Sequence, residues 1–426
     1  MKPLKIAMAG LGTVGGGVVK ALANPELAER AGRGFEIVAV SARDRGKDRG
    51  FDTTKFAWTA DALALARSDA DVVVELIGGE DGVALSLAEA ALAAGKHVVT
   101  GNKALLAKHG ARLAALAEKT GVALKFEAAV AGGIPIVKAL RESLVAYGVE
   151  TVRGILNGTC NYILTQMEAT GRGFADVLAE AQALGYAEAD PKLDVGGGDT
   201  AHKLVLLASL AFGTVPDQKN IAVDGIEGIT PMDIAFAREF GFRIKLLGIA
   251  RRTAQGIDQR VQPSMVKAGT PLADVDGVFN AVMANAGPAG RYFFEGRGAG
   301  EAPTALSVVA DLVDIARGNF GPAFGRPAAT LKPLVPSDPG AAVSAYYLRF
   351  EVLDVPGVLA EIAGHLAEAR VSIGSMVQRA RSPGEPVSIV MITHETAQAA
   401  VERALKAIAT SDKVRARPCM IPMEAA

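Results

Sequence analysis

Residues 5–17, KIAMAGLGTVGGG, determine the fold of the first part of the chain. Gly10, Gly12 and Gly15 form the pattern G-x-G-x-x-G between an apolar run at Lys5–Ala9 and a helical run that ends at Leu22. Glycines at this spacing allow a tight turn, a close approach of backbone to pyrophosphate and close helix–strand packing. The helix N-terminus adds N–H donors for phosphate. We therefore predict a dinucleotide loop made of Gly10, Leu11, Gly12, Thr13, Val14 and Gly15.

Short apolar runs alternate with Ala- and Leu-rich helical stretches throughout residues 1–130. Alternation of this kind forms a parallel sheet with helices on both faces. We expect residues 1–130 to form an α/β domain with a doubly wound parallel sheet of the Rossmann type. The expected strands are Lys5–Ala9, Phe35–Val40, Val72–Ile77, His97–Thr100 and Ala123–Phe126.

The segment after the second strand bears on which dinucleotide binds. It reads SARDRGK from Ser41 to Lys47, without the acidic residue expected at the strand tip. Arg43 and its basic neighbours can hold a 2′-phosphate, which favours NADP(H). Asp44 can instead accept a hydrogen bond from a free ribose hydroxyl, so NAD(H) stays open.

Composition excludes several classes of function. The chain has 426 residues, half of them apolar, with a formal charge of −1 and a pI near 6.6. The near-neutral charge argues against nucleic acid or an anionic membrane as a partner. The longest apolar stretch, Leu204–Gly213, is too short to span a bilayer, and Met1–Lys5 leads straight into a strand. Two distant cysteines match no metal or redox spacing. We expect a cytoplasmic enzyme without zinc.

Residues 131–317 mix helical and β-type runs. We expect an α+β domain that binds substrate and joins subunits into a homodimer or homotetramer, with its last helix packing back on the first domain. The expected helices are Pro135–Tyr147, Phe174–Leu184, Asp199–Ala211 and Asp233–Phe240, and the expected strands are Thr151–Leu156, Ile244–Arg251 and Val278–Ala284.

Five prolines follow between Gly318 and Gly340, so residues 318–344 are predicted to form an extended linker. Residues 345–426 then show the order βαββαβ, which predicts a ferredoxin-like module. Its expected elements are strand Ala345–Leu353, helix Val358–Ala369, strand Val371–Arg379, a loop at residues 381–386, strand Val387–Thr393, helix Ala397–Ile408 and strand Val414–Ile421.

Residues 184–209, LGYAEADPKLDVGGGDTAHKLVLLAS, form an acidic, glycine-rich loop that leads into an apolar helix. Asp199 and Lys203 are four residues apart, so on a helix they lie side by side. Such a pair is more often a solvated surface ion pair. Here the apolar residues Leu204–Leu207 follow, which indicates a buried helix whose polar start faces a cavity. We predict a proton-transfer site there.

At this point the sequence resembles the homoserine dehydrogenase family, through blocks that occur in that family's order and cover most of residues 5–317. The blocks are GLGTVGGGVV (10–19), ELIGG (75–79), TGNKALLA (100–107), EAAVAGGIP (127–135), NGTCNYIL (157–164), GYAEADPKLDVGGGDTAHK (185–203) and GRGAGEAPTALSVVAD (296–311). The resemblance implies reversible, NAD(P)-dependent interconversion of L-homoserine and L-aspartate 4-semialdehyde, a step toward threonine, isoleucine and methionine.

The resemblance also implies roles for single residues. Lys203 would donate and accept the proton at the substrate oxygen, with Asp199 beside it, and Lys103 would lie near both nicotinamide and substrate. The amino acid would be bound by Glu188, Asp194, Tyr186, Gly158 and Thr159. Gly185 and Gly300 would approach the cofactor, which Arg43 and Lys103 also contact. Glu127, Val130, Gly132 and Ile134 would bind a monovalent cation, Na⁺ or K⁺, largely through backbone carbonyls.

These residue types suit the chemistry. Reduction of an aldehyde by hydride builds negative charge on oxygen, which a nearby cationic acid such as Lys203 stabilises and then protonates. Two alternatives stay open: a dehydrogenase of another short amino acid, and a non-catalytic sensor of nucleotide and amino acid. The sensor is expected to lack Lys103, Asp199 or Lys203, and all three are present.

The segment LDVPGVLAEIAGHLAEARVSI, residues 353–373, resembles the opening of an ACT domain. Asp354 and Gly357 would shape a turn whose backbone amides bind a small amino acid where two modules pair. The resemblance implies feedback control, by threonine in many homoserine dehydrogenases. A ferredoxin-like module can also simply dimerise through its sheet edges or helices.

Overall fold

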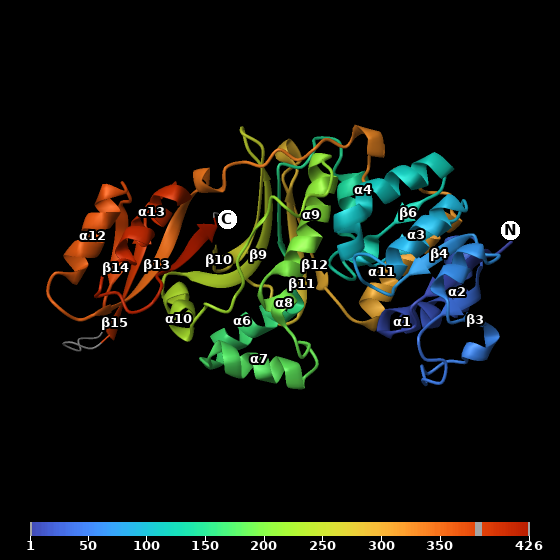
Figure 1. The fold of residues 1–426 in the computed structure, drawn as a ribbon, viewed down its shortest axis with the longest axis horizontal. Coiled ribbons are helices and arrows are strands. Elements are labelled where there is room, and N and C mark those ends of the chain that lie inside the picture. The colour runs from blue at the N-terminus through green and yellow to red at the C-terminus, as the bar shows by residue number, and fades with distance from the viewer. Residues whose placement is uncertain (1, 380–385, 425–426) are drawn as a thin grey trace.

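The computed structural model describes residues 2–379 and 386–424. The molecule is elongated, with three lobes in a row (Figure 1). The N-terminal lobe forms one end, the ACT-type lobe forms the other, and the C-terminus lies beside the central lobe. Within the described residues, no helix is long and apolar enough to cross a membrane.

The N-terminal lobe is built on a parallel sheet in the order β3-β2-β1-β4-β5-β6. Order reverses beside β1, which opens a crevice at the carboxyl ends of β1 and β4, where such folds bind ligands. The strands are β1 Leu4–Ala9, β2 Phe35–Ser41, β3 Ala57–Thr59, β4 Val72–Glu75, β5 His97–Thr100 and β6 Leu124–Lys125. The helices are α1 Thr13–Leu22, α2 Pro25–Ala31, α3 Val83–Ala93 and α4 Lys103–Thr120.

The chain returns to this lobe after the central one, through α11 (Glu301–Ala316). Helix α11 packs against α1, where a Cβ on Gly17 would lie 2.8 Å from the Glu301 side chain. Val308 and Leu312 of α11 are fully buried in the same core as Ile6 and Val18. The last helix of residues 131–317 therefore packs on the N-terminal lobe, as expected.

The central lobe sets a mainly antiparallel sheet against helices. Its strands are β7 Thr151–Ile155, β8 Ala222–Val223, β9 Phe242–Arg252, β10 Ile257–Lys267, β11 Phe279–Asn285 and β12 Arg291–Arg297. Its helices are α5 Ile136–Lys138, α6 Gly158–Thr170, α7 Phe174–Ala183, α8 Lys192–Val195, α9 Gly198–Phe212 and α10 Pro231–Glu239.

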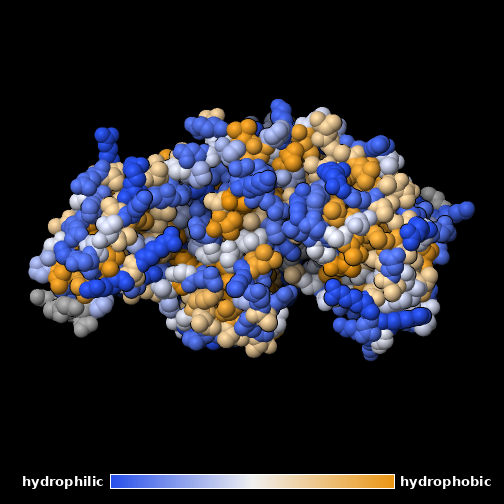
Figure 2. All heavy atoms as spheres, in the orientation of Figure 1, coloured by the Kyte–Doolittle hydropathy of each residue, from blue (hydrophilic) through white to orange (hydrophobic). Residues whose placement is uncertain are grey.

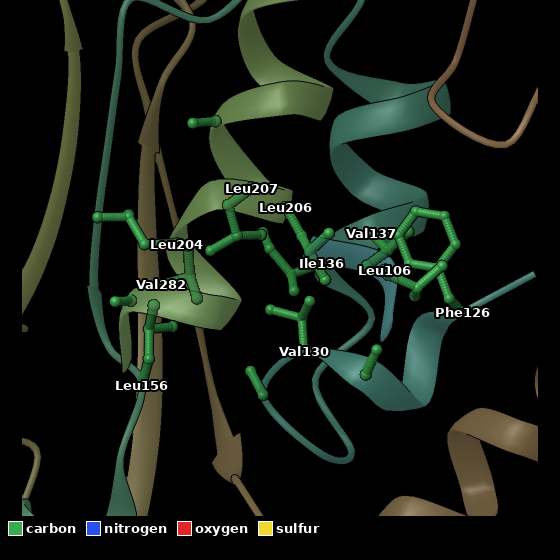
Figure 3. Packing of buried hydrophobic residues seen from close by; sticks show 14 of the residues in the cluster. Leu106, Phe126, Val130, Ile136, Val137, Leu156, Leu204, Leu206, Leu207 and Val282 are labelled. Atoms are coloured by element: carbon green, nitrogen blue, oxygen red, sulfur yellow. The ribbon is translucent and has the colours of Figure 1, made fainter. Parts of the chain in front are cut away.

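A continuous apolar core joins the N-terminal and central lobes (Figure 3). Leu206 of α9 points toward Ile136 and Val130, while Leu106 and Phe126 approach from the nucleotide lobe. All five side chains are essentially inaccessible to solvent. Because burial of each such side chain stabilises by about 1.5–3 kcal/mol, this core fixes α9 relative to α4.

The C-terminal lobe has the expected βαββαβ order. Its strands are β13 Val343–Leu353, β14 Ile373–Val377, β15 Pro386–Thr393, β16 Thr396–Ala397 and β17 Cys419–Glu424, and its helices are α12 Val358–Glu368 and α13 Gln398–Ile408. Strand β17 pairs with β13 on one side and, in parallel, with β10 on the other. The central and C-terminal sheets are thereby joined into one 11-stranded sheet.

Several expectations were wrong. The helix expected at Pro135–Tyr147 is only one turn, Ile136–Lys138, followed by a π-helical turn at Ala139–Ser143. The short strands β3 and β12, the strand β10 and the helix α6 were not predicted. Strand β10 contains Pro263 and many polar residues, which obscure its period. The last strand begins at Cys419, not Val414, because Pro418 interrupts the run. The loop expected at residues 381–386 lies, except for Pro386, outside the described residues.

The segment 318–344 is not a free extended linker. Phe324 is 1% exposed and packs on Phe126 with ring centroids 5.2 Å apart. Leu331 and Leu334 are also buried, and Thr214 pairs with Lys332. Apolar residues spaced between the prolines therefore attach the segment to the lobes it crosses.

A buried carboxylate connects the central and C-terminal lobes. Asp233 of α10 is 0% exposed and accepts hydrogen bonds from Arg349 Nε at 2.7 Å and Tyr347 Oη at 2.9 Å. Its other oxygen accepts from Thr230, which caps the same helix. One side chain therefore caps α10 and pairs with β13.

Substituting Asp233→Asn should lower the free energy of unfolding by about 3 kcal/mol, because it leaves the Arg349 guanidinium buried beside a neutral amide. Denaturant unfolding of the full chain measures the effect. Glu239→Gln is the matched control, since Glu239 pairs with Arg379 at the surface, where both side chains are exposed; little change is expected there. Equal losses in the two variants would contradict the interpretation.

Candidate active site

Helix α9 places Asp199 and Lys203 one turn apart at its N-terminus. The chain enters this helix through Gly197, whose φ of +86° favours glycine. Lys203 Nζ lies 2.7 Å from Asp199 Oδ2 and donates to the Leu156 carbonyl at 2.6 Å. Asp199 is only 6% exposed. The pair is a buried, directed contact at the end of β7, not a solvated surface pair.

A second lysine approaches the same carboxylate from the other lobe. Lys103 begins α4, and its Nζ lies 3.3 Å from Asp199 Oδ1. Burial alone would raise the pKa of Asp199, but the charges of Lys203 and then Lys103 lower it well below its usual range. Asp199 is therefore ionised at any physiological pH and holds both ammonium groups at the lobe boundary.

Asn157 completes this cluster and was not singled out from the sequence. Its Nδ2 donates to Asp199 Oδ2 at 2.9 Å and to Asp194 Oδ1 at 2.7 Å. Its Oδ1 accepts from the Cys160 N–H at 2.8 Å and so caps α6. The signal that could have found it is an Asn followed by Gly-Thr at a strand-to-helix junction.

A cavity of about 530 Å³ opens onto this cluster between the N-terminal and central lobes. In Figure 2 the surface is notched between the lobe that carries α6 and α7 and the lobe that carries α1. The expected site residues that line the cavity are Lys103, Gly132, Gly158, Thr159, Gly185, Tyr186, Asp194, Asp199, Lys203 and Gly300. Arg297 also lines it and was not expected.

The substrate-binding residues expected from the acidic loop separate into two groups. Asp194 on α8 faces the cavity, and burial raises the pKa of its carboxyl. Thr159 Oγ1 donates to the Tyr186 carbonyl at 2.6 Å, and the Tyr186 ring meets Tyr162 edge to face at 4.9 Å. The Glu188 side chain is exposed and is not part of the lining.

The glycine loop has the geometry of a phosphate cradle. A Cβ on Gly10 would lie 2.5 Å from the Leu76 carbonyl oxygen, and one on Gly15 would lie 2.1 Å from the Gly10 carbonyl oxygen. A Cβ on Gly12 would meet no atom within 4 Å. Gly10 and Gly15 thus serve tight packing, while Gly12 leaves open space in front of the α1 N-terminus, as a bound pyrophosphate requires. A dinucleotide fits these residues.

Basic side chains surround the segment after β2. Arg49, which was not singled out, donates to the Leu11 carbonyl at 3.2 Å and lies over the Trp58 ring. Arg43 is exposed. Asp44 accepts the Gly46 N–H at 2.8 Å within its own turn. The Asp44 carboxylate is thus engaged locally, while the side chains of Arg43, Arg45 and Lys47 are exposed.

Glu127 is the one side-chain ligand expected for a cation. It is 1% exposed, and its two oxygens accept the Val137 and Lys138 N–H groups at 2.8 and 2.9 Å. Burial, and next the charge of Asp311, raises its pKa to about 7. This carboxylate lacks an ammonium or guanidinium hydrogen-bond partner within the described residues.

The expected carbonyl ligands lie in the loop after Glu127. Ala131 and Gly132 both have left-handed φ angles, +55° and +58°, which turn this loop sharply. The Gly132 carbonyl accepts from Ser307 Oγ at 2.6 Å, and the Ile134 carbonyl accepts the Ile136 N–H at 2.8 Å. Val130 is buried. The all-oxygen donor set suits a hard monovalent cation. In the described residues no group of three or more His, Cys, Asp or Glu could hold a metal ion.

Two further residues, Gly357 and Cys160, lie outside the groups described so far. Gly357 has φ +93° and precedes α12, as the D-x-P-G turn with Asp354 requires. Cys160 is fully buried, its Sγ donates to the Asp194 carbonyl at 3.2 Å, and burial raises its thiol pKa well above the usual value. Cys160 is therefore a packing residue, not a nucleophile.

Comparison with known proteins matches these lobes in order. The homoserine dehydrogenase NAD binding domain matches residues 10–127, the homoserine dehydrogenase family matches residues 135–313, and the ACT domain matches residues 346–410.

Relatives agree over the full length. The homoserine dehydrogenase of Neisseria gonorrhoeae is 44% identical over 435 residues, covering 100% of this chain and 99% of its own. The crystal structure of a homoserine dehydrogenase from Thiobacillus denitrificans is 42% identical, covers 100% of this chain and 99% of its own, and superposes with a TM-score of 0.93. A hyperthermophilic archaeal homoserine dehydrogenase solved with NADPH shares the fold at 23% identity and a TM-score of 0.64, covering 76% of this chain and 100% of its own. The chain therefore belongs to the homoserine dehydrogenase family and is an NAD(P)-dependent oxidoreductase of that activity.

Proposed function

We propose that Lys203 is the proton donor and acceptor of this homoserine dehydrogenase, and that Asp199 and Lys103 set its charge and position. The observation that carries the proposal is the buried Asp199 carboxylate, which contacts an ammonium from each lobe at 2.7 and 3.3 Å. Both ammonium groups line the same cavity. A substrate bound in this cavity would therefore meet a cationic acid at its reacting oxygen.

In the oxidation direction, a nicotinamide held at the glycine loop would supply the hydride acceptor for the carbon that bears the homoserine hydroxyl. Lys203, in its neutral form, takes the hydroxyl proton, and the product is L-aspartate 4-semialdehyde. In reduction, the ammonium of Lys203 stabilises the developing alkoxide and returns the proton. The Leu156 carbonyl and Asp199 fix the direction of Nζ in both cases.

The amino-acid end of the substrate is assigned to Asp194, with Tyr186, Gly158 and Thr159 in the wall. Asn157 orients Asp194 through its 2.7 Å hydrogen bond, which supports the assignment. Glu188 is proposed to reach the substrate only when the exposed segment 185–190 closes over the cavity. Gly185 and Gly300, which line the cavity on opposite sides of the lobe boundary, are assigned to the cofactor.

We propose NADP(H) as the preferred cofactor. Asp44 is held in its own turn, so it is poorly placed to accept from a ribose hydroxyl. Arg43, Arg45, Lys47 and Arg49 supply positive charge beside the same loop. The NADPH bound in the archaeal relative supports the choice.

We further propose a Na⁺ or K⁺ ion at Glu127 with the carbonyls of Val130, Gly132 and Ile134, since a cation would compensate this buried carboxylate. Asp354 and Gly357 are proposed to bind an amino-acid effector, threonine being the first to test. We also propose that the protein is a homodimer or homotetramer in the cytoplasm. The proposed domain limits are 1–130, 131–317, 318–344 and 345–426.

Substituting Lys203→Ala should lower kcat for homoserine oxidation by about 10²–10⁴-fold, because the proton acceptor is lost. Nicotinamide absorbance measures the rate, and thermal unfolding checks the fold. Lys192→Ala, on the exposed face of the neighbouring α8, is the control and should keep full activity. Undiminished turnover in the Lys203 variant, at unchanged stability, would refute the assignment.

Homoserine oxidation should accelerate as pH rises from neutrality toward 10, because the reaction needs the neutral amine of Lys203. Asp199 stays ionised throughout this range, since its pKa is held far below it. Asp199→Asn removes the counter-ion of both lysines, so the proton leaves more easily and the alkaline limb should move to lower pH. A flat wild-type profile, or an unmoved limb in the variant, would contradict this account if chemistry limits the rate.

Substituting Arg43→Glu should raise KM for NADP⁺ by about tenfold or more and leave KM for NAD⁺ nearly unchanged, because only NADP⁺ carries the 2′-phosphate. Initial rates with each cofactor provide the test. Arg67→Glu, an exposed charge reversal away from the glycine loop, is the control. An equal effect on both cofactors would remove Arg43 from the 2′-phosphate site.

A further inference from the structure

Two further cavities lie at the seam between the central and C-terminal lobes. Their volumes are about 210 and 70 Å³, and both are lined by Arg251, Arg260, Ala342 and Val343. They share no lining residue with the cavity at Lys203. Strands β9 and β10 supply one wall, and the start of β13 supplies the other. A ligand here would touch both lobes at once.

Three guanidinium groups project from one face of the central sheet into this seam. Arg153 of β7 lies opposite Ile249 of β9, which in turn lies opposite Arg260 of β10. Arg251 is two residues from Ile249 and so points to the same face. The smaller cavity is lined by all three arginines.

Of the three guanidinium groups, only that of Arg260 donates several hydrogen bonds within the protein. Arg260 donates to Asp258 at 2.9 and 2.7 Å and to Gln398 at 2.8 Å. Arg153 donates one bond, at 3.2 Å, to Glu424. Arg251 reaches Glu424 only at 3.8 Å, beyond hydrogen-bond distance, and its Nε is buried without a partner in the described structure. An unmet buried donor of this kind needs an acceptor.

Carboxylates also surround the open donors. The two cavities are lined by the three guanidinium groups and by the carboxylates of Asp258, Asp338, Glu395 and Glu424. Asp258 is held by Arg260, and Asp338 accepts the Gly340 N–H of its own turn. Glu395 is exposed at the turn between β15 and β16 and lines the smaller cavity. A simple anion would meet Glu395 as a like charge, whereas a neutral ligand with both charges would not.

We propose that the seam cavity binds a small zwitterion of the α-amino-acid class. Its carboxylate would accept from Arg251 and Arg153, for which a planar guanidinium is well suited, and its ammonium would pair with Glu395. This site differs from the turn at Asp354 and Gly357. The two lie at opposite ends of β13, whose 11 residues span about 36 Å. The proposal does not depend on the assignments made at Lys203.

Isothermal titration of the full chain tests the site with three probes of one skeleton: L-valine, the matched acid 3-methylbutanoate and the matched amine isobutylamine. L-valine lacks the hydroxyl that the enzyme oxidises. We expect binding of the zwitterion alone. No binding of L-valine, or equal binding of the acid, would overturn the proposal.

Variants locate the binding. Arg251→Gln and Glu395→Gln should each weaken L-valine binding at least tenfold. Arg252→Gln, which removes the neighbouring exposed guanidinium that lies over Phe212, and Asp354→Asn, at the distant turn, should leave it unchanged. Binding unchanged in Glu395→Gln, or lost in Asp354→Asn, would overturn the proposal. Because Glu395 is an exposed turn residue, its variant decides the test even if Arg251→Gln fails to fold.

Discussion

The buried carboxylate of Asp199 is the interaction on which the candidate active site depends. It contacts Lys203 of its own helix, Lys103 of the nucleotide lobe and Asn157 at the cap of α6. An anion buried this deeply is tolerated only if its charge is compensated. The compensation comes from three separate elements, so placing Asp199 also places the two lysines that face the cavity.

Such a contact across a lobe boundary needs rigid support, and the apolar core around Leu206 supplies it. Helix α9 carries Asp199 and Lys203 in its first two turns and is buried from Leu204 to Leu210, so packing sets its position and its N-terminal turns can serve chemistry. Helix α11 reinforces the boundary from the other side, because it leaves the central lobe at Gly300 and packs on α1. The glycine loop and the cavity wall are therefore held by one chain segment.

The C-terminal lobe is attached by backbone and by charge. Strand β17 bridges β10 and β13, and Asp233 pairs with Arg349 and Tyr347 across the seam. Helix α10, which carries Asp233, leads directly into β9, and Gly248 of β9 packs against Thr200 and Leu204 of α9. A ligand at the seam would thus touch strands that pack directly against the helix of Lys203. The physical link between them is the packing of β9 and β10 on α9.

The sequence by itself determined the features that depend on local chemistry. The glycine spacing predicted the nucleotide loop, the strand–helix alternation predicted the parallel sheet, and the i, i+4 spacing placed Asp199 beside Lys203. It also predicted the βαββαβ order of the last lobe. Most of the cavity-lining residues lie in the sequence blocks that resemble the family. Residue roles, cation and effector remain predictions.

Tertiary structure decided the features that depend on distant partners. Asn157 becomes a bridge only because Asp194 and Asp199 approach its amide from other elements. Arg49 and Arg297 carry no local signal, and Glu188 lies outside the cavity because its segment is exposed. The proline-rich segment packs against the N-terminal lobe because the Phe324 ring contacts the Phe126 ring. Secondary-structure propensity and hydrophobic period depend on neighbouring residues and can be read from the sequence. Burial and charge compensation arise only when residues far apart in sequence come into contact.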